Sequence, residues 1–90
     1  FGMYGGREET VTLSFPNRLI GVVMDRFGKD ADIRPLENGE FRVRARIFVS
    51  GQFFGWLSGI GGEAHIVSPG YVRSDYMNWL AGILKGMENE

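Results

Sequence analysis

Hydrophobic and polar residues alternate without a break from Phe41 to Val49, in the stretch FRVRARIFV. Successive side chains of a β-strand point to opposite faces of its sheet. The alternation therefore predicts a strand with one buried apolar face. The opposite face carries a row of three arginines, which are Arg42, Arg44 and Arg46.

Three further segments have the pattern of strands. Residues 10–15 alternate between small polar and large apolar side chains, which predicts a half-buried strand. Residues 31–36 predict a second strand, and Pro35 places it at an edge of the sheet because proline cannot donate a hydrogen bond to a neighbour. Residues 63–67 predict a short fourth strand.

Apolar residues at helical spacing predict three helices between and after these strands. The start and stop signals are Pro16-Asn17 and Gly28 for the first helix, Ser50 and Gly61-Gly62 for the second, and the N-cap and proline pair Ser68-Pro69 for the third. The expected buried stripes are Leu19, Ile20, Val23, Met24 and Phe27, then Phe53, Trp56, Leu57 and Ile60, then Val72, Tyr76, Trp79, Leu80, Ile83 and Met87.

The order of the predicted elements indicates an α+β fold. Strand, helix, strand, strand, helix, strand is the ferredoxin-like βαββαβ plan, a two-layer sandwich with helices on one face of the sheet. Here it is followed by an additional C-terminal helix. Two right-handed crossovers would place the first and third strands in the centre. We expect residues 1–9 to be a linker or lead-in, and residues 10–90 to form one domain.

The turn at Asn38-Gly39 sets the register between the second and third strands. A two-residue type I′ turn would put Ile33 opposite Arg44. A three-residue loop with a left-handed Gly39 shifts the register by one residue and puts Ile33 opposite Val43. Only the second arrangement keeps apolar and charged side chains on separate faces, so we predict the bulged hairpin.

This register decides how far the arginine row is neutralised. It opposes Asp32 to Arg44, and Asp30 would face Arg46 if the strand extended so far. At the other end, Arg34 and Arg42 face each other across the two strands without an acidic neighbour. The candidate effector- or anion-binding residues are Arg34, Arg42, Arg44 and Arg46.

Composition narrows the function classes. The chain has 90 residues, 43% of them hydrophobic and 23% charged, with a formal net charge of −1. The basic excess of a free-standing nucleic-acid binder is missing. With no cysteine and one histidine, His65, the sequence predicts neither a disulfide nor a metal site, and no cofactor. No apolar run approaches the ~20 residues of a membrane span, so we expect a cytoplasmic protein without a membrane partner.

Two functions known on the same topology fit poorly. RNA-recognition domains stack bases on aromatic residues of the central strands, whereas the outward positions here are threonine, serine and arginine. A weak phosphate contact and a merely solvated face both remain open. Acylphosphatases need a glycine-rich phosphate cradle after the first strand, and the segment Phe15-Pro16-Asn17-Arg18 lacks it. His65 has no neighbouring nucleophile in sequence, and we expect no enzymatic activity.

Aromatic residues are concentrated in the second half of the chain. Most of them fall on the predicted helical stripes and belong to the core. Phe54 and Tyr71 fall off these stripes, and exposed aromatic side chains on a small domain often mark an interface. The candidate interface residues are Phe54, Tyr71, Tyr76 and Trp79.

Several segments together resemble the WCX domain, the C-terminal extension of WYL-domain helix-turn-helix transcriptional regulators. VTLSF matches its first strand, and ENGEFRVRARI matches its hairpin and apolar strand. GWLSGIGGEAHIVSP and GYVRSDYMNWL match a helix with Trp-Leu, a glycine turn, a short strand and a proline that opens the last helix. FGMYGG resembles the segment that joins the WYL and WCX domains. The matching positions are Trp56, Leu57, Gly61, Ala64, Ile66, Pro69 and Arg73.

The resemblance implies a regulatory C-terminal domain that contributes to dimerisation and to signal transmission. It implies upstream WYL and winged helix-turn-helix domains in the same chain, a homodimer, and a nucleic-acid or nucleotide effector. DNA would be read only by the missing N-terminal domain. The WYL motif itself is absent from this sequence, so its ligand-sensing residues are not carried over. The alternative is a small-molecule-binding module resembling ACT domains, with its ligand at a helix–sheet rim.

Overall fold

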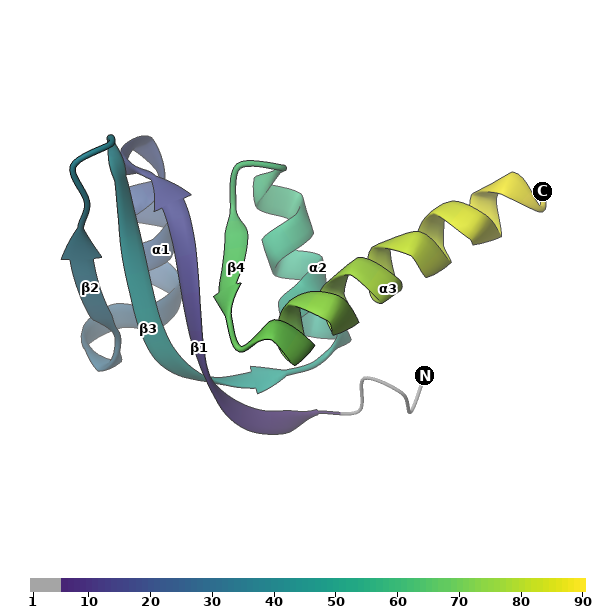
Figure 1. The fold of residues 1–90 in the computed structure, drawn as a ribbon, viewed down its shortest axis with the longest axis horizontal. Coiled ribbons are helices and arrows are strands. Elements are labelled where there is room, and N and C mark those ends of the chain that lie inside the picture. The colour runs from purple at the N-terminus through teal and green to yellow at the C-terminus, as the bar shows by residue number, and fades with distance from the viewer. Residues whose placement is uncertain (1–5) are drawn as a thin grey trace.

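The computed structural model describes residues 6–90 (Figure 1). The elements, with η for a single 3₁₀ turn, are β1 (Arg7–Pro16), η2 (Asn17–Leu19), α1 (Ile20–Phe27), η3 (Gly28–Asp30), β2 (Asp32–Pro35), β3 (Glu40–Val49), α2 (Gly51–Ile60), β4 (His65–Ser68) and α3 (Gly70–Glu88). The predicted order of strands and helices is confirmed.

Within residues 6–90, four antiparallel strands form one sheet in the order β2-β3-β1-β4. β1 and β3 lie in the centre, as predicted, and pair along their whole lengths from Arg7↔Val49 to Pro16↔Glu40. β2 lies at an edge and ends at Pro35, as that proline indicated. β4 forms the opposite edge and pairs with β1.

The core lies between the sheet and the helices α1 and α2, which cover one of its faces (Figure 1). Burial alternates along β3, so the face predicted from FRVRARIFV is confirmed. Aromatic contacts join the layers: the Phe15 and Phe41 rings stack at 5.5 Å across the central strands, and Phe27 of α1 meets Trp56 of α2 at 5.6 Å. The buried core residues are Val11, Leu13, Phe15, Val23, Phe41, Val43, Ala45, Ile47, Val49, Phe53, Phe54, Leu57, Ala64, Ile66 and Val72.

The bulged β2–β3 hairpin is confirmed. The register pairs Asp32 with Arg44 and Ile33 with Val43. The loop of residues 37–39 is closed by a hydrogen bond of 2.8 Å from the Leu36 N–H to the Glu40 carbonyl, and Gly39 has φ +81°. A positive φ of this size is the left-handed conformation that glycine adopts without steric cost.

The helix boundaries agree with the sequence in part. The Ser50 side chain accepts a hydrogen bond of 3.3 Å from the Phe53 N–H, which confirms the predicted N-cap of α2. The predicted N-cap at Ser68 is wrong, because Ser68 is the last residue of β4 and pairs with Thr12. Pro69 occupies the N-cap position of α3 instead.

The first predicted helix is shorter and more exposed than expected. A 3₁₀ turn precedes it, and α1 proper begins at Ile20. Val23 is its one buried residue, whereas Ile20 and Met24 are exposed. The neighbouring strand β2 has four residues, so the sheet offers little apolar surface beneath this helix.

The first strand is longer than predicted. β1 begins at Arg7, because residues 7–9 pair with residues 47–49 of β3. The last part of the expected lead-in, residues 7–9, is therefore strand. Residues 1–5 of that lead-in lie outside the described residues.

The helix α3 has 19 residues and is about 28 Å long. Its first half packs against β4 and α2, and its second half extends away from the sheet (Figure 1). Every residue from 80 to 90 is exposed. Within residues 6–90, none of the helices combines the length and apolar character needed to cross a membrane.

Candidate anion-binding face

The sheet face opposite α1 and α2 carries the predicted arginine row. Arg42, Arg44 and Arg46 of β3 are all exposed, and Arg34 of β2 is exposed beside them. The strand register places one residue from each of the four strands in a line across this face of the sheet. Its members are Arg34, Arg42, Ser14 and His65.

Two of the four candidate arginines have acidic partners. Arg34 Nε lies 3.3 Å from an oxygen of Asp32, two residues away on the same strand. The predicted cross-strand pair of Asp32 with Arg44 is therefore wrong, although the register that suggested it is right. Both side chains of the observed pair are largely exposed, and such pairs contribute about 0–1 kcal/mol.

The partner of Arg46 also differs from the prediction. Its guanidinium lies 3.0 Å from Glu8 Oε1, on the extended start of β1. Asp30, the predicted partner, belongs to the 3₁₀ turn before β2 rather than to the strand. The unexpected length of β1 thus supplies the acid that neutralises this end of the row.

Arg42 and Arg44 make no ion pair within residues 6–90. Together with Thr12, Asp32 and Arg34 they line a shallow hollow of about 290 Å³ on the open face. Guanidinium groups present several N–H donors in a plane that matches carboxylate and phosphate oxygens. The hollow has the chemistry of an anion site, with Asp32 as its one acidic lining residue.

The face lacks a platform for base stacking. Within residues 6–90, Phe48 is the aromatic residue at the outward positions of the two central strands, and its side chain is 58% exposed. It lies beside the Glu8 end of the row, away from Arg42. An anion on this face would be held by charge and hydrogen bonds rather than by stacking.

A second polar cluster, which sequence reasoning missed, joins the start of β1 to the first turns of α3. The Tyr71 hydroxyl donates to a carboxylate oxygen of Glu9, and Arg7 contacts both Glu9 at 2.7 Å and Asp75 at 3.3 Å. The guanidinium of Arg7 also lies 5.3 Å from the centre of the Tyr71 ring. Residues of β1 and α3 are too far apart in sequence for any local pattern to reveal this contact.

The cluster changes the acid–base properties of its members. The hydrogen bond from Tyr71, and then that from Arg7, lower the pKa of Glu9 below its ordinary value. The same bond to Glu9 raises the pKa of Tyr71, because it stabilises the protonated phenol. At neutral pH, Glu9 is therefore a carboxylate and Tyr71 a phenol.

Arg18 and Glu63 form a further ion pair between the turn after β1 and the turn before β4. Their hydrogen bond lowers the pKa of Glu63 and raises that of Arg18. Arg18 is exposed, and its guanidinium is bonded to Glu63. It has no part in the arginine row.

The four candidate interface residues lie in different environments. The exposure predicted for Phe54 is wrong: it is fully buried, with ring centroids 5.2 Å from Tyr76 and 5.8 Å from Trp79. These two residues of α3 are half-buried against the core. Tyr71 is 50% exposed and is bonded to Glu9. Whether any of them contacts a partner stays a prediction.

The predicted buried stripe of the last helix is only partly buried. Val72 is buried, and Tyr76 and Trp79 are half-buried, because α2 and β4 cover only the first turns of α3. Six other large hydrophobic side chains of α3 are exposed to solvent. The exposed ones are Tyr71, Met77, Leu80, Ile83, Leu84 and Met87.

Within residues 6–90, no group of three or more histidine, cysteine, aspartate or glutamate side chains is placed to hold a metal ion. The family model of the WCX domain matches residues 7–84. No curated protein and no solved structure matches the chain at a significant level.

Proposed function

The chain belongs to the WCX domain family, and on this premise we propose that it is the non-catalytic, regulatory C-terminal domain of a WYL-type bacterial transcriptional regulator. Its partners in the same chain are upstream WYL and winged helix-turn-helix domains. Operator DNA is read by the winged helix-turn-helix, and the regulator acts in the cytoplasm. The domain has the ferredoxin-like plan with an added helix, which the strand order β2-β3-β1-β4 supports.

We propose that the domain dimerises through α3. The observation that carries this proposal is the spacing of exposed apolar residues on the part of α3 that leaves the body of the fold. They follow one another at intervals of three, four and three residues, which is the a/d spacing of a coiled-coil seam. The seam consists of Met77, Leu80, Leu84 and Met87, which are 39–58% exposed.

The seam is complementary to itself. In an antiparallel pair of α3 helices, Leu80 of one copy lies opposite Leu84 of the other, and Met77 lies opposite Met87. The same residues of both copies are then buried, as a two-fold dimer requires. Each fully buried side chain of this size contributes about 1.5–3 kcal/mol relative to exposure, before the cost of association is subtracted.

Sedimentation velocity of the 90-residue chain over a range of concentrations tests the dimer. We expect a monomer–dimer equilibrium in the unsubstituted chain and a monomer in Leu84→Glu, because a carboxylate would be buried in the seam. Val22→Glu is the matched control, since Val22 is a comparably exposed apolar residue on α1. A monomer at every concentration in the unsubstituted chain would refute the α3 dimer.

A second candidate role is the response to an anionic effector at the open face of the sheet. The observation that favours it is the pair Arg42 and Arg44, which have no acidic partner within residues 6–90. A nucleic acid or nucleotide supplies the phosphate oxygens that such a pair binds.

Titration with a short single-stranded oligothymidylate tests this role. We expect the double substitution Arg42→Gln and Arg44→Gln to abolish binding, and Arg34→Gln with Arg46→Gln to weaken it less, because these two arginines already have acidic neighbours. The slope of log affinity against log salt falls by about 0.7 for each lost phosphate contact. Equal effects of the two double variants would contradict a site centred on Arg42 and Arg44.

A further inference from the structure

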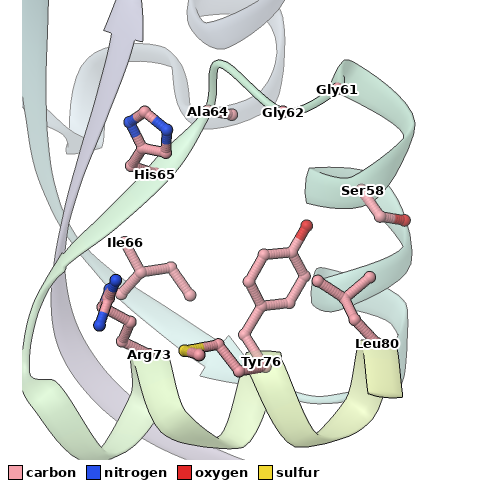
Figure 2. Close-up of a pocket in the computed structure, with 10 residues that line it drawn as sticks. Ser58, Gly61, Gly62, Ala64, His65, Ile66, Arg73, Tyr76 and Leu80 are labelled. Carbon is pink, nitrogen blue, oxygen red and sulfur yellow. The ribbon is translucent and has the colours of Figure 1, made fainter. Parts of the chain in front are cut away.

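A second hollow lies at the β4 edge of the sheet, between the end of α2, the strand β4 and the first half of α3 (Figure 2). Its volume is about 590 Å³, within the range of roughly 300–1,000 Å³ typical of small-molecule sites. The arginine row takes no part in it, because none of Arg34, Arg42, Arg44 and Arg46 lines it. It exists because α3 leaves the sheet at an angle and does not close over β4.

The lining is apolar at its base and basic on one side. Ile66 of β4 and Met77 and Leu80 of α3 form apolar walls. Figure 2 shows Arg73 and His65 on the β4 side with Ile66 between them, and the guanidinium of Arg73 extends alongside Ile66. Tyr76 stands between the walls, and its hydroxyl points toward the end of α2.

The charges of this site are unbalanced. None of the residues that line the hollow is acidic, whereas two of them, Arg73 and His65, are basic residues. Arg73 makes no ion pair within residues 6–90. The acid nearest in sequence to His65 is Glu63, whose carboxylate is bonded to Arg18. A guanidinium beside an apolar wall, with no carboxylate to neutralise it, is suited to a ligand that supplies that carboxylate.

Two further groups define how a ligand would lie. The Tyr76 hydroxyl points toward the end of α2, and partial burial raises the pKa of Tyr76, so that it stays protonated and is able to donate a hydrogen bond to a ligand. The Ser58 hydroxyl donates its proton to the Gly55 carbonyl at 3.0 Å and is therefore not free to donate to a carboxylate. Arg73 is thus the charged donor of the hollow, and the sulfur of Met77 and the methyls of Leu80 remain for an apolar group.

We propose that this hollow binds a small monocarboxylate with an aromatic or branched apolar body. The carboxylate pairs with the guanidinium of Arg73. The apolar body lies on Ile66, Met77 and Leu80. The four candidate arginines of the open face take no part in this site, whereas His65 belongs to both the hollow and that face. Met77 and Leu80 belong to both the hollow and the proposed α3 seam, so a dimer through α3 would cover this part of the hollow.

Isothermal titration calorimetry with 4-phenylbutyrate tests the site. The protein is the 90-residue chain carrying Leu84→Glu, so that a second copy cannot cover Met77 and Leu80; Leu84 does not line the hollow. We expect 4-phenylbutyrate to bind at least tenfold more tightly than 4-phenylbutanol, which has the same body without the charge. We expect Arg73→Gln to remove this preference, and Arg42→Gln, at a residue that does not line the hollow, to retain it.

The outcomes separate this site from the proposed function. Equal binding of the acid and the alcohol, or an unchanged preference in Arg73→Gln, would overturn the carboxylate site. Absence of binding by either compound would overturn it as well, whether or not the unsubstituted chain dimerises. Circular dichroism of each variant must match that of the parent. If Arg73→Gln does not fold, Arg73→Lys replaces it, and we then expect a weakened preference because lysine cannot pair bidentately.

Discussion

The hydroxyl of Tyr71 donates a hydrogen bond to the carboxylate of Glu9, 62 residues earlier in the chain. The bond ties the first turn of α3 to the start of β1, beyond the part of the sheet that α1 and α2 cover. Arg7 reinforces it by contacting Glu9 and Asp75 on the same two elements. The attachment of α3 to the sheet is thus partly polar and exposed.

This bond predicts a pH dependence of stability. The pKa of Glu9 lies below its ordinary value of 4.5 in the folded chain. The stabilisation is therefore complete above pH 4.5 and is lost as the pH falls through the lowered value. As the pH is lowered below 4.5, we expect the urea midpoint of unfolding to fall less in Glu9→Gln and in Tyr71→Phe than in the parent chain. Glu37→Gln, in the exposed hairpin loop, is the control, and an equal flattening there would contradict the assignment.

Two glycines should respond to alanine in opposite directions. Gly39 has φ +81° in the hairpin, so Gly39→Ala forces a strained conformation and should lower the free energy of unfolding by about 1 kcal/mol. Gly21 lies exposed in α1 with no atom near the position of an added methyl, so Gly21→Ala should raise it by about 0.5–1 kcal/mol. Denaturation in urea measures both, and a stabilising Gly39→Ala would refute the bulged hairpin.

Phe54 should be among the most sensitive core positions. It is fully buried between α2 and α3, and Phe54→Ala should cost about 3–5 kcal/mol, a large part of the stability of a domain of this size. Phe54→Leu leaves less empty space and should remain folded with a lowered thermal midpoint. Phe48→Ala is the matched control: Phe48 is 58% exposed, and its loss should change that midpoint little.

The cap of α2 gives another pair of matched variants. Ser50→Ala removes the bond to the Phe53 N–H and should lower the free energy of unfolding by about 1 kcal/mol. Ser58→Ala removes a hydroxyl inside the same helix that bonds only to the carbonyl of Gly55, where alanine is the better helix former. Its effect should be near zero or stabilising, and a larger loss in Ser58→Ala than in Ser50→Ala would contradict the cap.

Features set by neighbouring residues could be predicted from the sequence. The parity of β3, the left-handed Gly39 and the N-cap at Ser50 each depend on a few adjacent residues, and all three are confirmed. The edge position of β2 follows from the missing N–H of Pro35 in the same way.

Features set by distant or flexible groups could not be predicted from the sequence. The backbone register places Asp32 opposite Arg44, yet the Asp32 carboxylate binds Arg34. Exposed ion pairs contribute only about 0–1 kcal/mol, so the register does not decide which of two nearby arginines an exposed carboxylate binds. Glu8 reaches Arg46 because β1 extends further than its alternation indicated. The exposure of the last helix depends on how it packs against β4, which its own apolar spacing does not encode.

The edges of the sheet limit how this protein can associate. β2 and β4 are four residues long, and β2 ends at a proline that cannot donate a backbone hydrogen bond. At these two short strands a foreign strand would find few free donors and acceptors, whereas residues 7–11 of β1 and 45–49 of β3 pair only with each other and keep one free edge each. Strand addition, the route to fibres, is thereby confined to the end of the sheet where β1 and β3 extend beyond their neighbours.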